Sequence, residues 1–314
     1  MSRAQVFIPI LQQYGTVDVL ISSRDHDLAL PITPTYQLNG LGFTFGKSGG
    51  IDYWKSLRRF KLIRFLYDLV RFRIRDYDVI INDFEPLTAW KCKLLGKRII
   101  GLSHHASYLS KLAPRPAKKD WFTELVLTYH SPCSVNYCFH FERYDSNIYT
   151  PILRPEIREG RTQKLKHIVV YLPSIAAENL VPYFELHPQF TFKIFCKHSK
   201  KYYREKNVEV HQIDTASYIN ALLSSCGVIC NAGFEAASEA IHLGKKLLCI
   251  TMKGQYEQRC NAEALKRMGV TVADEFNTTF AQTLQEWLIH GKEIQITYPD
   301  ISKDIIRKIM DEEI

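Results

Sequence analysis

The sequence predicts an α/β protein with two Rossmann-like domains, each built on a doubly wound parallel sheet. The chain has 314 residues, of which 46% are apolar, so it is long enough for two domains. Short apolar runs alternate with helical segments, an order typical of parallel sheets. A stretch rich in charges, with two prolines and a glycine, separates two such regions. We therefore expect an N-terminal domain over 1–153, a linker over 154–165, a C-terminal domain over 166–300 and a last helix over 301–314.

The first half opens with a helix and continues with alternating elements. The expected elements are a helix over 2–14, strands over 17–23 and 41–45, a helix over 53–75, a strand over 78–81, a helix over 88–95 and a strand over 97–103. The glycine-rich segment 46–50 lacks the upstream glycine of a phosphate loop, so we predict a flexible loop there. The proline-rich basic segment 111–119 is a candidate lid over an acceptor.

Two strands of this half end in polar side chains. Asp83 follows the strand over 78–81, and His104 and His105 follow the strand over 97–103. Strand ends form the ligand crevice of open α/β sheets, so these residues are candidates for catalysis. Neighbouring residues on an extended chain face opposite ways, and we take His104 as the candidate base or acceptor ligand. For Asp83 the alternative is a helix N-cap.

The second half repeats the alternation and contains the most informative stretch. The expected elements are strands over 167–172, 190–196, 208–213, 228–230 and 247–251, with helices over 176–184, 215–224, 234–243, from 256, over 279–290 and over 301–310. Gly233 makes a tight turn between a buried strand and a helix, where free backbone N–H groups and the positive helix end suit a phosphate. Glu239 lies on that helix and can accept hydrogen bonds from a diol. Glu257 and Gln258 begin the next helix and can face the same crevice.

The distribution of charge indicates what kind of partner the protein binds, and the cysteines indicate in which cellular compartment it is found. Residues 1–155 hold 21 Lys and Arg against 13 Asp and Glu, whereas residues 156–314 hold 20 of each. The helix over 53–75 interleaves basic and aromatic residues, so the basic half is expected to meet an anionic membrane surface rather than nucleic acid. A solvated basic face is the alternative. Eight scattered cysteines without a Cys-x-x-Cys pair, no signal peptide and no spanning segment predict a cytoplasmic protein, peripheral at the inner face of the membrane.

The stretch from 228 to 262 resembles the nucleotide-sugar signature of two-domain, GT-B type glycosyltransferases, both MurG-type and plant-type UDP-glycosyltransferases. The matching positions are Gly233, Glu239, Gly244, Glu257, Gln258 and Asn261. The resemblance implies that Glu239 holds the ribose and that Glu257 and Gln258 hold the donor sugar. Asn231 stands where the plant-type family has His, and Glu235 and Ala236 stand where it has Asn and Ser. We therefore expect the phosphate contacts to rest mainly on the backbone of Asn231, Ala232, Gly233 and Phe234.

The same resemblance assigns further residues. It implies that Ser174 contacts a phosphate and that the base of the nucleotide binds near Ile213. It also implies that Asp83 pairs with a catalytic His, which the family carries in a turn after its first strand. That strand and its His are not found in this sequence, so the sheet is expected to lack an inner member. Either the start lies upstream of Met1, the chain is truncated, or the element has been lost. In the family, the last helix crosses back to the first domain.

Together these features predict a glycosyltransferase that moves a sugar from a nucleotide-sugar, expected to be a UDP-sugar, to a hydroxyl of a lipid-linked or cell-envelope glycan. No Asp-x-Asp motif occurs in the expected place, so we predict neither a metal nor a cofactor. One alternative is a UDP-sugar epimerase of the same fold, which would need carboxylates around the sugar in both domains. Another is a non-catalytic nucleotide- or glycan-binding protein.

Overall fold

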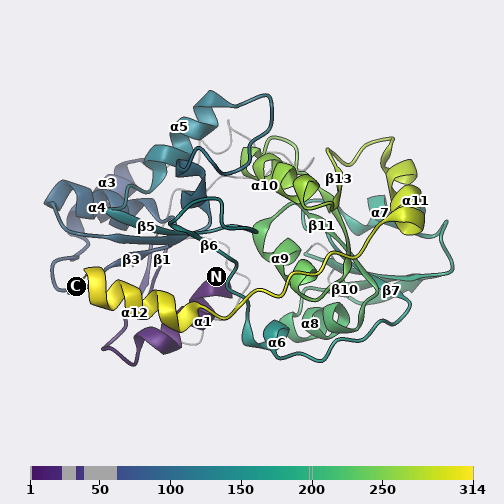
Figure 1. The fold of residues 1–314 in the computed structure, drawn as a ribbon, viewed down its shortest axis with the longest axis horizontal. Coiled ribbons are helices and arrows are strands. Elements are labelled where there is room, and N and C mark those ends of the chain that lie inside the picture. The colour runs from purple at the N-terminus through teal and green to yellow at the C-terminus, as the bar shows by residue number, and fades with distance from the viewer. Residues whose placement is uncertain (1, 23–32, 39–61, 198, 200, 314) are drawn as a thin grey trace.

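The computed structural model describes residues 2–22, 33–38, 62–197, 199 and 201–313. The expected strand over 41–45, the loop over 46–50 and the first part of the helix over 53–75 lie outside these residues. Figure 1 shows two α/β domains side by side, with the chain crossing between them in the linker and again near the C-terminus. No described helix has both the length and the hydrophobicity needed to cross a bilayer.

The N-terminal domain carries parallel strands in two separate sheets. Strands β1 and β2 form one, and the other has the order β3-β4-β5-β6. The strands are β1 (Leu20–Ile21), β2 (Tyr36–Gln37), β3 (Ile81–Asn82), β4 (Ile100–Ser103), β5 (Val135–Phe139) and β6 (Ile148–Tyr149). The helices are α1 (Ser2–Leu11), α3 (Leu62–Arg71), α4 (Pro86–Leu95), the short 3₁₀ helix η1 (His105–Leu109) and α5 (Trp121–His130).

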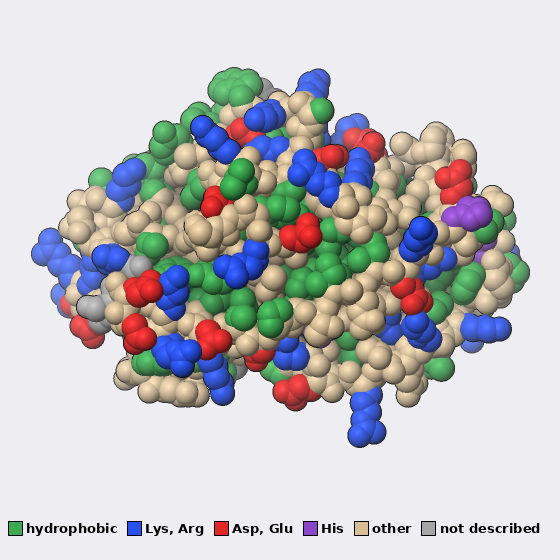
Figure 2. Space-filling model, in the orientation of Figure 1, with side chains coloured by type: hydrophobic (Ala, Val, Ile, Leu, Met, Phe, Trp, Pro, Cys, Tyr) green, Lys and Arg blue, Asp and Glu red, His purple; other side chains and the backbone are tan. Residues whose placement is uncertain are grey.

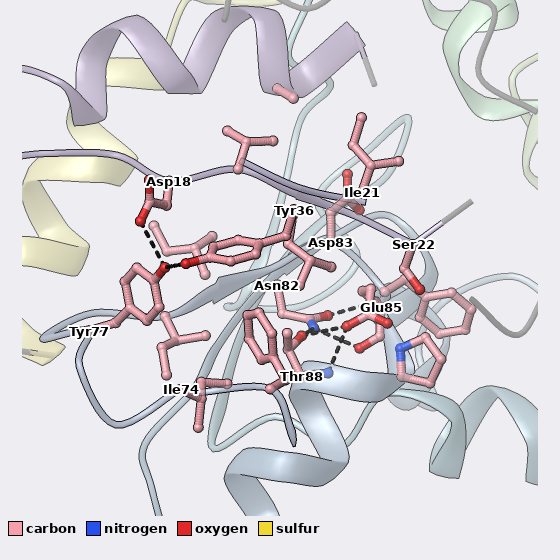
Figure 3. A pocket seen from close by; sticks show the side chains of 18 of the residues that line it. Asp18, Ile21, Ser22, Tyr36, Ile74, Tyr77, Asn82, Asp83, Glu85 and Thr88 are labelled. Atoms are coloured by element: carbon pink, nitrogen blue, oxygen red, sulfur yellow. Dashed lines mark hydrogen bonds between the residues drawn. The ribbon is translucent and has the colours of Figure 1, made fainter. Parts of the chain in front are cut away.

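The two sheets of this domain leave a gap between them. Among the described residues, no strand pairs with the second edge of β1 or of β3, and a cavity of about 390 Å³ lies between these edges. Val19 to Ser22 line one wall and Val79 to Asp83 the other, with Tyr36 and Tyr77 closing one end (Figure 3). Among the described residues, the sheets are therefore interrupted between β1 and β3, and the missing inner strand stays a prediction.

The C-terminal domain is built on one seven-stranded sheet of order β13-β12-β11-β7-β8-β10-β9, parallel except at the β9 edge. The strands are β7 (His167–Tyr171), β8 (Thr191–Cys196), β9 (Tyr203–Glu205), β10 (Val208–Gln212), β11 (Gly227–Asn231), β12 (Lys246–Ile250) and β13 (Thr271–Ala273). The helices of this domain are α7 (Ala177–Phe184), α8 (Thr215–Ser224), α9 (Phe234–His242), α10 (Tyr256–Arg267) and α11 (Phe280–His290). Helix α6 (Pro155–Arg158) lies in the linker, and α12 (Ser302–Glu313) packs on α1 of the N-terminal domain. The predicted fold class, two parallel-sheet α/β domains, is confirmed.

This sheet is buried on both faces, as its near-continuous apolar strands require. Along β7, Ile168 and Val170 pack in one core cluster with α7 and α11, while Val169 packs in another with α8, α9 and α10. The second cluster continues into the N-terminal domain through Phe7 and Phe139. The two domains therefore share hydrophobic core where they meet.

Three expected elements end differently in the structure. The helix over 53–75 stops at Arg71, because Ile74 turns inward to pack with Ala89 and Ile99. The strand over 17–23 is reduced to the two residues of β1. The linker, for which we predicted no helix, contains the short helix α6, whose Ile157 is buried in the shared core.

The surface near α5 combines exposed apolar and basic side chains. Every residue of α5 is at least partly exposed, and Trp121 and Phe122 are 75% and 52% exposed. Lys118 and Lys119 immediately precede the helix and are exposed as well. Figure 2 shows hydrophobic and Lys or Arg side chains intermingled at the top of the molecule, where Figure 1 places α5. This helix is poorly covered by the rest of the chain.

Candidate active site at the domain boundary

The turn between β11 and α9 presents backbone N–H groups at the boundary of the two domains. Asn231 ends the buried strand and Gly233 is the N-cap of α9, with no side chain capping the helix. Within the part of the chain that the structure describes, the first N–H groups of α9 therefore lack a side-chain acceptor. A Cβ built on Gly233 would meet none of the described residues within 4 Å, which leaves room beside this turn. An anion approaching here would meet the positive end of the helix.

Arg3 of α1 links this turn to the N-terminal domain. Its Nη2 donates to both carboxylate oxygens of Asp83, each at 3.0 Å, and its Nη1 donates to Oε1 of Glu235, in the first turn of α9. The guanidinium carbon also lies 5.7 Å from the ring centroid of Phe139 and 6.0 Å from that of Phe234. One buried cation thus pairs with a carboxylate from each domain.

Pairing with Arg3 determines the charge of Asp83. Burial alone would raise the pKa of the Asp83 carboxyl, but the adjacent guanidinium outweighs this and lowers it. Asp83 is therefore ionised and held in a bidentate pair. The next residue, Phe84, has a φ of +59°, which is uncommon for a bulky residue and marks a constrained turn.

His104 is buried and fully engaged. Its Nδ1 lies 2.7 Å from the carbonyl oxygen of Phe139, and its Nε2 lies 3.1 Å from Oδ1 of Asn261. Its ring stacks on Phe234 at a centroid distance of 3.9 Å and an interplanar angle of 5°. Burial lowers the pKa of His104 to about 4, so the ring is neutral at pH 7.

His105 makes a different contact across the same boundary. Its Nε2 lies 3.0 Å from Oε2 of Glu257, at the start of α10. Burial alone would lower the pKa of His105, but the carboxylate of Glu257 outweighs this and raises it. Burial alone would raise the pKa of Glu257, but His105 lowers it to about 2. This contact joins the two domains, and it is an ion pair when the His105 ring is protonated.

The other residues expected to hold the donor have separate partners. Glu239 is buried, and its Oε1 accepts from Nε and Nη2 of Arg154, at 2.9 and 2.7 Å. Burial raises the pKa of Glu239 to about 7, against the opposing effect of Arg154. Oε1 of Gln258 accepts from the backbone N–H of Met252 at 3.0 Å. Among the described residues, no hydrogen bond joins Glu239, Glu257 and Gln258 to one another.

Ser174 and Ile213 lie further along the sheet. Ser174 follows β7 and Ile213 follows β10, and both are partly exposed. Strands β7, β10 and β11 belong to the parallel part of the sheet, so these positions lie along the same carboxyl edge as Asn231. The turn residue Ala232 is buried, and its carbonyl accepts from Nδ2 of Asn261 at 3.0 Å.

Some residues of this boundary were not singled out from the sequence. Arg3 and Arg154 lie in a helix start and in a linker, where arginines are common, so the sequence offers no signal for their buried ion pairs. The pair between His105 and Glu257 joins residues 152 positions apart. Among the described residues, no group of three or more His, Cys, Asp or Glu is arranged to hold a metal ion.

The comparisons with known proteins agree with this architecture. The model of the family described as glycosyl transferase family 1 matches residues 55–290, well over half of the chain. A search of curated protein sequences found no significant match.

Several solved structures have a similar fold. One is UGT89C1 of Arabidopsis thaliana complexed with UDP-L-rhamnose, with a TM-score of 0.56, 13% identity and coverage of 98% of this chain and 90% of that chain. Another is SsfS6, a glycosyltransferase of Streptomyces sp. SF2575, with a TM-score of 0.53, 12% identity and coverage of 99% and 95%. At these identities the likeness shows the fold alone. With the family match, it completes the assignment: the chain belongs to glycosyl transferase family 1 and is a glycosyltransferase of the GT-B type.

Proposed function

We propose that this enzyme transfers a sugar from a UDP-sugar to a hydroxyl group of a lipid-linked or cell-envelope glycan, without a metal ion. The observation that carries the proposal is the turn from Asn231 to Phe234, an uncapped helix start inside the region matched by the family model. A UDP donor is favoured because the similar UGT89C1 structure holds UDP-L-rhamnose. The diphosphate would lie at the α9 N-terminus, with the ribose toward Glu239 and the sugar toward Glu257 and Gln258.

In this reaction the acceptor oxygen attacks the anomeric carbon of the donor. The new C–O bond forms as the bond between that carbon and the diphosphate oxygen breaks, and the leaving UDP takes the electron pair. Backbone N–H groups at the start of α9 would stabilise the charge that develops on the diphosphate. A base takes the proton of the acceptor hydroxyl.

A lipid-linked acceptor is supported by the surface of the N-terminal domain. The apolar residues Ile63 and Val70 of α3 and Trp121 of α5 are 86%, 77% and 75% exposed. Together with the excess of Lys and Arg in residues 1–155, they would suit the surface of an anionic membrane. Association with that surface would bring the active site to an acceptor held in the bilayer.

Calorimetry with UDP, UDP-glucose and UDP-N-acetylglucosamine tests the donor site. Wild-type protein should bind UDP, and Glu239→Gln should bind it roughly 10–100-fold more weakly, since a hydrogen bond to a charged group contributes about 1.5–3 kcal/mol. Gln keeps the shape of the side chain and an acceptor for Arg154, but it leaves the buried Arg154 charge unpaired, so the melting temperature should fall. Thermal melting therefore checks that the variant is folded at the temperature of the calorimetry.

The matched control is Glu286→Gln, an exposed position on α11, which should bind UDP like the wild type. Equal UDP affinity in the Glu239→Gln variant would refute the ribose contact. Absence of binding to all three compounds by the wild type would refute the proposed donor. Product analysis with donor alone would reveal an epimer if the enzyme were instead an epimerase.

A further inference from the structure

The proposed function requires a base that takes the proton of the acceptor hydroxyl, and the inference made here rests on that function. The described residues that could take part in this proton transfer come from both domains. Asp83, His104 and His105 lie at the carboxyl ends of β3 and β4, facing α9 and α10 of the other domain. A base must hold a free lone pair near the acceptor and must be able to release the proton afterwards. These requirements separate the three candidates.

Asp83 and His104 are poorly placed to act as a base. Both carboxylate oxygens of Asp83 accept from Arg3, which stabilises the ionised form and weakens its basicity. The ring of His104 is 2% exposed and stacked on Phe234, and both of its nitrogens have partners. A substrate hydroxyl would have to displace buried protein contacts to reach the His104 ring. Asp83 is 39% exposed, but its ion pair with Arg3 occupies both of its oxygens.

His105 meets the requirements. Its side chain is 31% exposed, and its ring stacks on Phe84 at a centroid distance of 4.2 Å and an angle of 10°. Nε2 faces the carboxylate of Glu257 at 3.0 Å, whereas Nδ1 is buried and has no hydrogen-bond partner among the described residues. A buried ring nitrogen without a partner is unfavourable, and a hydrogen bond from a substrate hydroxyl would relieve it. Nδ1 is covered in this structure, so neighbouring atoms must move aside for the acceptor, but unlike the His104 nitrogens it has no protein contact to break.

We propose that His105 is the catalytic base of the transfer and that Glu257 is its positioning residue. Nε2–H donates to Glu257, which fixes the tautomer and orients the ring, and the lone pair of Nδ1 takes the proton of the acceptor hydroxyl as its oxygen bonds to the anomeric carbon. The imidazolium formed is stabilised by the carboxylate and then releases its proton to water. Because Glu257 begins α10 of the donor domain, the base is assembled only when the two domains are in contact.

The charges around His105 determine the pH dependence. Glu257 and Asp83 raise the pKa of His105, Arg3 lowers it, and the neighbouring rings of His104 and His130 have lowered pKa values. Since a base must be unprotonated, the rate should rise with pH through a midpoint above the usual 6.5 of histidine. Replacing Glu257 by Gln removes the main raising influence, so the midpoint should move to lower pH.

The test measures UDP release from UDP-glucose and UDP-N-acetylglucosamine with water as acceptor, alongside calorimetry with UDP. His105→Ala should lower kcat by about 10²–10⁴-fold with UDP affinity within threefold of wild type, and added imidazole should restore part of the rate. His290→Ala, at the exposed end of α11, is the matched control and should retain wild-type kcat.

A readout independent of turnover is the NMR titration of the His105 ring in wild type and in Glu257→Gln. The midpoint should lie above 6.5 in the wild type and fall in the variant. Wild-type kcat in His105→Ala, or an unchanged His105 midpoint in Glu257→Gln, would overturn the proposal. Absence of UDP binding and UDP release in the wild type would instead refute the proposed function, so the two failures are distinguishable.

Discussion

At the scale of single residues, the domain boundary is held by buried polar groups whose charge states differ. Arg3 and Arg154 are charged and paired with carboxylates, whereas His104 is neutral. Charged side chains are buried only with partners, because an unpaired charge in the interior is costly. The neutral His104 ring needs no counter-charge, and its one N–H can donate from Nδ1 to the carbonyl oxygen of Phe139 at 2.7 Å.

The buried neutral histidine predicts sensitivity to acid. The pKa of His104 is about 4 in the folded protein and about 6.5 when unfolded, so the unfolded state binds more protons between these values. Its contribution to stability is complete above pH 6.5 and is lost as the pH falls toward 4, with a loss of about 2 kcal/mol at pH 5.

Urea unfolding at pH 7.5 and pH 5 measures this loss. His104→Gln should reduce the difference between the two pH values by about 2 kcal/mol. Some acid sensitivity should remain, since burial also lowers the pKa of His130 to about 4, while the raised pKa of Glu239 acts in the opposite direction. The same difference in His104→Gln as in the wild type and in the exposed control His290→Gln would contradict the assignment.

At the scale of elements, the bounds of helices and strands were predicted best where a buried strand is followed by a glycine turn and an amphipathic helix. The unit β11–α9 begins and ends within one residue of the expected positions, because a five-residue buried strand and a helix that begins after a glycine turn are both local patterns. Helix α5 and strand β5 were not predicted. The apolar side chains of α5 are exposed, so its sequence lacks a periodic buried face.

The same exposure makes α5 the element that we expect to touch a membrane. Trp121, Phe122, Leu125 and Tyr129 are 49% to 75% exposed, and Lys118 and Lys119 lie just before them. In co-sedimentation, wild-type protein should bind vesicles of phosphatidylglycerol and phosphatidylcholine better than vesicles of phosphatidylcholine alone. Trp121→Ser with Phe122→Ser should weaken this binding at least tenfold, because burying each aromatic contributes roughly 1.5–3 kcal/mol.

The matched control for this surface lies in the other domain. Leu186 and Ile289 are 70% and 64% exposed, and their replacement by Ser removes similar apolar area away from α5. The control should bind vesicles like the wild type. Equal weakening in both double variants, or no preference for the anionic vesicles, would argue against a docking role for α5.

At the scale of the whole molecule, the two domains are joined by more than the linker. The chain returns after α11, and α12 packs on α1 along the lower edge of the N-terminal domain in Figure 1. Hydrophobic core continues from Phe139 to Phe234 across the boundary, an ion pair joins Arg3 to Glu235, and a hydrogen bond joins His105 to Glu257. Such contacts link residues far apart in sequence, which is why the sequence predicted the two domains but not how they pair.

The last prediction concerns the charge at this junction. Glu235 lies in the first turn of α9, where the proposed diphosphate would be repelled by an unpaired carboxylate, and Arg3 neutralises it. Arg3→Met should therefore weaken UDP binding about tenfold, equivalent to about 1.4 kcal/mol. Adding Glu235→Gln should restore most of the lost affinity, because the repulsion is removed together with its counter-charge.

Calorimetry at low and high salt measures both changes, and the loss in Arg3→Met should shrink as salt screens the repulsion. The exposed linker residue Arg161, changed to Met, controls for the loss of one positive charge. If the double variant binds no better than Arg3→Met alone, the junction acts through domain packing and not through the charge of Glu235.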